Sequence, residues 1–165
     1  MSTVDFTLEN FNPPGAVPPT DIIPACLPAP CSIVSVDENA TPGDIAALGV
    51  VDADQTGGHT FEVLSDPRFE VVGNVLRIVD GAAIDFESGA SPLDLTLRVT
   101  DNDGNVYTEV LSVVVNDVNE APNEIVLDNN FVPADEAGAS IGLLQVTDPD
   151  VTTPDFIDGY WHFVL

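Results

Sequence analysis

The sequence contains no lysine and only three basic residues, Arg68, Arg77 and Arg98, against 28 acidic residues. Its formal net charge of −25 excludes electrostatic binding to nucleic acid or to an anionic membrane surface. A chain this acidic either attracts cations or uses its charge to keep the surface hydrated, as in proteins from salty habitats. The positions of the acidic residues along the chain, rather than their number, favour cation binding.

Cysteines and long apolar runs are also scarce. With only Cys26 and Cys31, the chain lacks the ligand pairs of a zinc ribbon. The two cysteines would form a small disulfide loop in a secreted protein, or else remain as unpaired thiols. No apolar run reaches the ~18 residues of a membrane-spanning helix, so we expect no direct membrane insertion. Residues 1–11 lack the basic start and apolar core of a signal peptide, so an export signal would lie on a missing part or act by another route.

A hydrophobic content of 44% is sufficient for a folded core. Residues 1–30 are rich in proline, which predicts an extended arm or linker with little regular structure before Cys31. After this arm, short segments with apolar alternation are separated by turn residues, and no helical period is present. The predicted strands are 32–36, 46–54, 59–64, 68–73, 74–81, 93–101 and 106–117. Their number and spacing predict an all-β fold, a seven-stranded Greek-key β-sandwich.

Two parts of the sequence are similar to each other, which indicates a repeat. Glu38 aligns with Glu136, 98 positions later, in segments 34–54 and 132–150. The pair Asp52 and Asp54 aligns with Asp148 and Asp150, 96 positions later. We therefore expect one whole repeat and the start of a second. The expected parts are the arm at 1–30, a repeat at 31–118, a linker at 119–123 and an incomplete second repeat at 124–165.

Acidic residues recur at four points of this scheme. They are Glu38 after the first strand, Asp52 and Asp54 after the second, Asp85 and Glu87 before the sixth, and a polar linker containing Asp117, Asn119 and Glu120. In a sandwich, several of these points converge at the end where the chain leaves the domain. Calcium prefers six to eight oxygen ligands from carboxylates, amides and carbonyls, and a dication turns the repulsion between carboxylates into attraction.

The order and spacing of these motifs resemble the cadherin repeat, in the form common in large bacterial surface proteins. The motifs are Glu38, Asp85-Phe86-Glu87, the linker "DVNEAP" (117–122) and Asp148-Pro149-Asp150. The resemblance implies a cadherin/immunoglobulin-like sandwich with a calcium cluster of up to three ions between adjacent repeats. The calcium ligands that it implies are Glu38, Asp85, Glu87, the Val118 carbonyl, Asn119, Glu120, Asp148 and Asp150.

The sequence also departs from the cadherin pattern. The linker is one residue shorter than in the family, so it lacks one amide ligand. At the other end of the first repeat, Asp52, Asp54 and Asp101 could form half of a further calcium site, with only Asp21 as a ligand from the preceding segment. The two histidines, His59 and His162, are solitary, and we interpret them as surface or turn residues rather than ligands.

The sequence therefore predicts a calcium-binding cadherin-like module of an extracellular or cell-surface adhesion or repeat protein, with calcium rigidifying the junction between repeats. Its expected partners are neighbouring repeats of the same or a longer chain, and a cell-surface protein or glycan. An alternative is a structural or carbohydrate-binding accessory module of a secreted enzyme or particle. We expect no enzymatic activity, because no nucleophile with a base in reach is visible.

Overall fold

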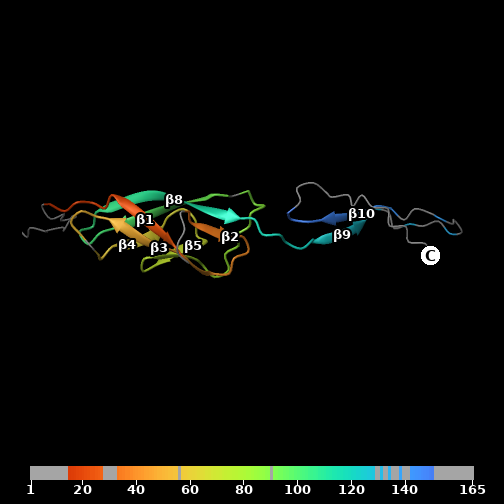
Figure 1. Ribbon diagram of the computed structural model, residues 1–165, viewed down its shortest axis with the longest axis horizontal. Coiled ribbons are helices and arrows are strands. Elements are labelled where there is room, and N and C mark those ends of the chain that lie inside the picture. Colours follow the sequence, from red (N-terminus) through yellow and green to blue (C-terminus); the bar gives the residue numbers. More distant parts are fainter. Residues whose placement is uncertain are drawn as a thin grey trace, which may run out of the picture. The chain divides into compact units, whose positions relative to one another are not determined.

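The computed structural model describes residues 15–27, 33–55, 57–89, 91–128, 131, 134, 138 and 142–150. The chain divides into two compact units, Met1–Asp117 and Val118–Leu165. All of the regular structure in the described residues is β (Figure 1). Within this part of the chain, no helix is long and apolar enough to cross a membrane.

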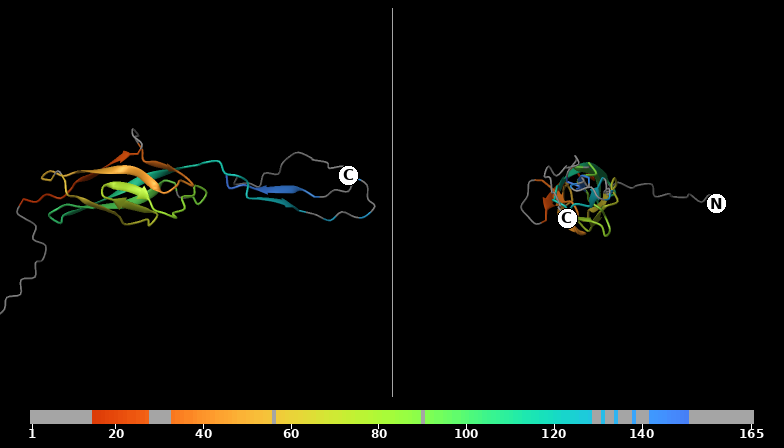
Figure 2. Two further views of the ribbon diagram at one scale, coloured as in Figure 1. Left: turned by 90° about the horizontal axis from the view of Figure 1, so that it is seen from below. Right: turned by 90° about the vertical axis from the view of Figure 1, so that its right-hand side faces the viewer.

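The first unit contains two four-stranded sheets, whose strands run roughly lengthwise (Figure 2). One sheet has the order β1 (Asp21–Cys26), β3 (Gly43–Val51), β6 (Val75–Ile78) and β5 (Phe69–Val72), with antiparallel neighbours. The other has the order β2 (Ser35–Asp37), β8 (Val106–Asn116), β7 (Leu93–Thr100) and β4 (Thr60–Val63). In this second sheet β2 runs parallel to β8, and the other pairs are antiparallel. The predicted all-β sandwich is confirmed.

The core lies between the two sheets and follows from the two-residue period of the strands. In β7, Leu93, Leu95, Leu97 and Val99 are all buried, while the residues between them are half-buried or exposed. Apolar residues of the opposite sheet complete the core, among them Ile22, Leu48, Phe69, Leu76 and Ile78. Burying each such side chain stabilises the fold by about 1.5–3 kcal/mol relative to leaving it exposed.

Strand β1 corrects the prediction that residues before Cys31 have little regular structure. Each of the seven predicted strands has a counterpart in β2 to β8, but β1 makes eight in the described part of the first unit. Proline is tolerated in β1 because β1 is an edge strand. Ile22 directs its N–H away from β3, to the Glu109 carboxylate at 2.9 Å, and Pro24 lies two residues further along the strand. The missing N–H of Pro24 is therefore one that the sheet does not use.

The last residue of β1, Cys26, is disulfide-bonded. Cys31 is the other cysteine of the sequence and lies outside the described residues.

The second unit contains an antiparallel pair, β9 (Glu124–Leu127) and β10 (Leu144–Thr147) (Figure 1). In this pair Leu127 lies opposite Leu144. Strand β10 ends directly before Asp148, and β3 ends directly before Asp52. That the two segments are repeats stays a prediction. Several of its apolar side chains are exposed, including Ile125 at 69% and Leu144 at 41%. Among the described residues of this unit none is buried, so they form no sandwich core like that of the first unit. An isolated two-stranded sheet is only marginally stable in water.

Candidate metal centre

Three carboxylates of the first unit gather at the end where β2 and β8 finish. Carboxylate oxygens of Glu38, Glu87 and Asp117 all lie within 4.8 Å of one another. The pairing of β2 with β8 explains two of the three positions. Asp37 and Asn116 are register partners in this parallel pair, so the next residues, Glu38 and Asp117, leave the sheet side by side. We call Glu38, Glu87 and Asp117 the exit triad.

Glu38 is held firmly within the exit triad. Its residue is only 2% exposed, and its Oε2 accepts a hydrogen bond from the Phe86 N–H at 2.9 Å. Its own N–H donates to the Asn116 carbonyl at 3.0 Å. The next residue, Asn39, has a φ of 55° and donates its N–H to Ile84. Asparagine tolerates this left-handed conformation, so the chain turns sharply after Glu38.

The third carboxylate belongs to Glu87, in the turn at residues 86–89. Because Phe86 is bonded to Glu38, this turn is fastened beside the exit triad. Asp85 stabilises the same turn, since its Oδ1 accepts the Ser88 N–H at 3.1 Å and its carbonyl accepts the Ser88 hydroxyl at 2.7 Å. Asp85 is thus two residues from Glu87 of the exit triad, and one of its carboxylate oxygens caps the turn.

The electrostatics of the exit triad favour a bound cation. Partial desolvation raises the pKa of the Glu87 carboxyl, and the neighbouring carboxylates of Glu38 and Asp117 raise it further. A raised carboxyl pKa means that the ionised form is disfavoured where it stands. The three arginines form ion pairs with acidic residues outside the exit triad. The pairs are Arg68–Asp66, Arg77–Asp44 and Arg98–Glu62.

The ligand chemistry of the exit triad also fits a hard cation. All of its donors are carboxylate oxygens, which suit calcium or magnesium and not a soft metal. Three carboxylates supply between three and six oxygens, so calcium would require further ligands from nearby residues.

The predicted ligands of the second unit are connected to one another. The Glu120 N–H donates to Asp150 Oδ2 at 2.7 Å, and the Asp150 N–H donates to Asp148 Oδ1 at 3.2 Å. The Asn119 side-chain amide donates to the Glu120 carbonyl at 3.0 Å, and Val118 precedes it with 41% of its surface exposed. Within this unit, the linker residues and the Asp148–Asp150 pair therefore form one polar group.

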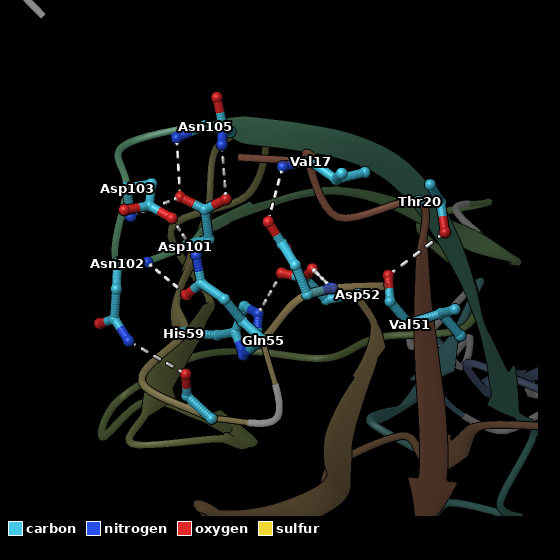
Figure 3. A network of polar contacts seen from close by, with 12 residues as sticks. Val17, Thr20, Val51, Asp52, Gln55, His59, Asp101, Asn102, Asp103 and Asn105 are labelled. Carbon is cyan, nitrogen blue, oxygen red and sulfur yellow. Dashed lines mark hydrogen bonds and ion pairs between the residues drawn. The ribbon is translucent and has the colours of Figure 1, made fainter. Parts of the chain in front are cut away.

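At the other end of the first unit, protein donors form hydrogen bonds with Asp52 and Asp101 (Figure 3). Asp54 also accepts a hydrogen bond from the protein. His59 Nε2 lies 2.8 Å from Asp52 Oδ2. Asp54 Oδ2 accepts the Val17 N–H at 2.8 Å. The carboxylate of Asp101 accepts three hydrogen bonds, from the N–H groups of Asp103 and Asn105 and from the Asn105 amide, at 2.8–2.9 Å.

These contacts lower the carboxyl pKa values of Asp52 and Asp101, whereas the pKa of Glu87 in the exit triad is raised. The hydrogen bond from His59 lowers the pKa of Asp52. Burial acts to raise the pKa of Asp101, but the hydrogen bonds from Asn105 and Asp103 outweigh it, and the pKa is lowered. The ionised carboxylates are stabilised here by the chain itself.

No protein-family model and no curated protein matches the sequence. Solved structures do. Domains 3–6 of protocadherin gamma B2 match with a TM-score of 0.54 and 21% identity over 70% of this chain and 28% of that chain. Domains 1–5 of the same protein match with a TM-score of 0.53 and 21% identity, over 78% of this chain and 26% of that chain. The extracellular domain of protocadherin gammaB4 matches with a TM-score of 0.52 and 23% identity, over 86% of this chain and 22% of that chain.

The fold is that of a cadherin-like repeat. The chain spans about a quarter of the length of these protocadherin structures. At this identity the likeness concerns the fold alone, and the bacterial form of the repeat stays a prediction.

Two residues of this cadherin-like repeat have positions that the sequence analysis did not anticipate. Asp117 belongs to the exit triad, although the ligands predicted within the linker began at Val118. It is the first residue of the "DVNEAP" motif, so the signal was present in the sequence. His59 was interpreted as a surface or turn residue, but its side chain is only 5% exposed and pairs with Asp52. The structure describes no residue beyond 150, so His162 lies outside the described part.

Proposed function

We propose that the chain is a calcium-binding cadherin-like module of an extracellular adhesion or repeat protein, in which calcium rigidifies the junction between repeats. The exit triad carries this proposal, because its three carboxylates approach one another, and Glu38 and Asp117 help to raise the pKa of Glu87. A dication supplies the missing positive charge. We favour calcium over magnesium because calcium accepts more oxygens in a looser geometry.

The linker supplies the further oxygens in this proposal. Val118, Asn119 and Glu120 follow Asp117 directly, and a chain extends at most about 3.5 Å per residue. The Val118 carbonyl, the Asn119 side chain and the Glu120 carboxylate are therefore covalently restricted to the neighbourhood of the exit triad. The hydrogen bond from Glu120 to Asp150 supports recruiting Asp148 and Asp150 as well. Asp85, two residues before Glu87, is the remaining proposed ligand.

The proposed setting is the cell surface or the extracellular space, where calcium is abundant. The cadherin-like fold and the disulfide bond at Cys26 support this location. The proposed partners are neighbouring repeats of the same or a longer chain, and then a cell-surface protein or glycan. In this role the module acts through its shape and stiffness, without catalysis.

Thermal unfolding with and without calcium tests the proposal. Extracellular modules bind calcium at roughly 0.1–1 mM, so a few millimolar calcium should add on the order of 1–2 kcal/mol to the free energy of unfolding. For a domain of this size, the melting temperature should rise by about 5 °C or more. Glu87→Gln should abolish most of this rise. Glu70→Gln, an exposed residue of β5 outside the exit triad, is the matched control and should leave it intact.

An equal calcium-induced rise in the wild-type protein and the Glu87→Gln variant would place the ion elsewhere. No rise in the wild-type protein, with no calcium uptake, would reject the proposed function.

A further inference from the structure

The carboxylates at the two ends of the first repeat differ in their surroundings. At one end they accept hydrogen bonds from the protein, and at the other they approach one another. Asp101 follows β7 and the exit triad follows β8, and these antiparallel neighbours run from Leu93↔Val113 to Thr100↔Val106. Asp101 therefore lies at the opposite end of the sheet from Asp117. His59 precedes β4, whose first residue, Thr60, pairs with Thr100, so His59 and Asp101 share that end. We call Asp52, Asp54 and Asp101 the entry carboxylates.

We propose that the entry carboxylates form a metal-free junction, in which the protein's own N–H groups occupy the place that calcium takes in the cadherin pattern. The sequence resemblance implied half of a calcium site here, and the donor arrangement does not fit one. This inference concerns the end of the repeat that the proposed function does not use.

At Asp52, His59 occupies the position beside the carboxylate that a cation would take. Its Nε2 lies 2.8 Å from Asp52, and both side chains are almost completely buried, at 5% and 0% exposure. An ionised carboxylate can only accept, so the imidazole Nε2–H donates this hydrogen bond. A metal ion that displaced His59 from Asp52 Oδ2 would leave a buried donor without its acceptor. Such a loss costs the full desolvation of the donor.

Asp101 is even more fully engaged. Its residue is 5% exposed, and three N–H donors converge on its two oxygens from Asp103 and Asn105. The surrounding loop is closed by further contacts, since the Gln55 side chain donates to Asp103 at 2.7 Å and accepts the Asn102 N–H at 3.1 Å (Figure 3). The Asp101 carboxylate thus stabilises the loop after β7 through three of its lone pairs.

The third entry carboxylate fastens the preceding segment. Asp54 accepts the Val17 N–H, and the N–H and hydroxyl of Thr20 both donate to the Val51 carbonyl, at 2.8 and 3.2 Å. The chain that enters the repeat is therefore held by direct hydrogen bonds. Among the described residues, the one group of three or more carboxylates, histidines or cysteines close enough to share an ion includes none of the entry carboxylates.

This arrangement has a mechanical consequence. The entry of the repeat keeps its geometry whether or not calcium is present. If the proposed function holds, only the exit side stiffens with calcium, so the repeat has one permanent and one calcium-dependent end.

A calcium titration of the full chain, followed amide by amide by NMR, tests this inference. We expect saturable shifts at Glu38, Phe86 and Glu87, and unchanged signals at the entry amides of Val17, Asp103 and Asn105. Saturable shifts at the entry amides would overturn the metal-free junction. Unchanged signals at both ends would support it while rejecting the proposed function, so the two failures are distinguishable.

Two variants make the test independent of spectral assignment. Asp54→Asn keeps an acceptor oxygen for Val17 but removes a charge, and it should leave the calcium affinity unchanged, whereas Glu87→Gln should weaken it by roughly tenfold or more. His59→Ala should lower the melting temperature equally in calcium and in chelator. A weaker calcium affinity in Asp54→Asn, or a rescue of His59→Ala by calcium, would contradict the inference.

Discussion

The buried carboxylate of Glu38 accepts a hydrogen bond from the N–H of Phe86, the residue that immediately precedes Glu87. One oxygen of Glu38 thus fixes the turn that brings the second carboxylate into the exit triad. The structural and the electrostatic roles of Glu38 can be separated by two substitutions.

Glu38→Ala leaves the Phe86 N–H without its acceptor, which should cost about 1–3 kcal/mol of stability in calcium and in chelator alike. Glu38→Gln retains an acceptor oxygen but removes the charge. It should unfold close to the wild-type protein in chelator and bind calcium more weakly. Denaturant unfolding and calorimetry measure the two effects. Wild-type calcium affinity in Glu38→Gln would exclude Glu38 as a ligand.

The metal-free exit triad should respond to pH through Glu87. Its pKa in the folded protein is raised above the ordinary value of 4.5, so its ionisation destabilises the folded state as pH rises through the raised value. In chelator at neutral pH, Glu87→Gln should therefore melt at a higher temperature than the wild-type protein. The difference should disappear below pH 4.5. A variant that melts lower in chelator at neutral pH would show that the charge of Glu87 is already compensated.

Ionisation of Asp101 should have the opposite effect on stability to ionisation of Glu87. Its folded-state pKa lies below 3.8, so its ionised form stabilises the folded protein at neutral pH, and this contribution is lost as pH falls below 3.8. Asp101→Asn should lower the melting temperature by several degrees at neutral pH, and the difference from wild type should shrink in acid. Melting curves across this range measure it. A constant difference down to strongly acidic pH would mean that packing, and not charge, explains the loss.

Strand β1 should contribute to the core through one face only. Ile22 is 4% exposed and Ile23 is 50% exposed, although they are adjacent and chemically identical. Ile22→Ala should destabilise the protein by about 2–5 kcal/mol, and Ile23→Ala by about 0.5 kcal/mol or less. Urea unfolding of both variants provides the comparison. Equal effects would show that β1 does not pack as an edge strand of the sandwich.

The second unit should exchange its amide protons faster than the first. β9 and β10 pair only with each other among the described strands, and Ile125 and Leu144 are exposed. The β7–β8 pair, in contrast, covers a buried core. Hydrogen exchange should give much lower protection in β9 and β10 than in β7 and β8. Equal protection would show that the second unit is stabilised by contacts that its own two strands do not provide.

The strands were predictable where burial alternates simply. In β7, the sequence LDLTLRVT shows which side chains point inward, and the structure follows it. Strand β1 was missed because the many prolines of the first 30 residues outweighed the pair Ile22 and Ile23. A proline at an edge strand costs little, but edge positions depend on the topology, which local composition does not reveal.

The gathering of carboxylates was predictable in part from the motifs, and calcium binding by them stays a prediction. Glu38 and Glu87 were both expected, and both belong to the exit triad. The entry carboxylates show the limit of this reasoning, because their environment depends on tertiary pairing. Asp54 accepts a hydrogen bond from Val17, 37 residues earlier, and the side chain of His59 is almost completely buried beside Asp52. A motif shows where carboxylates stand along the chain but not which donors reach them.

Calcium uptake by isothermal titration calorimetry tests the central claim most directly. The wild-type chain should bind calcium with a Kd of roughly 0.1–1 mM. The triple variant Glu38→Gln/Glu87→Gln/Asp117→Asn should give no saturable heat. A control with the same chemical changes at exposed positions, Glu70→Gln/Asp80→Asn/Glu124→Gln, should bind like the wild-type chain. Absence of calcium uptake by the wild-type chain, or unchanged uptake by the exit-triad variant, would contradict the account.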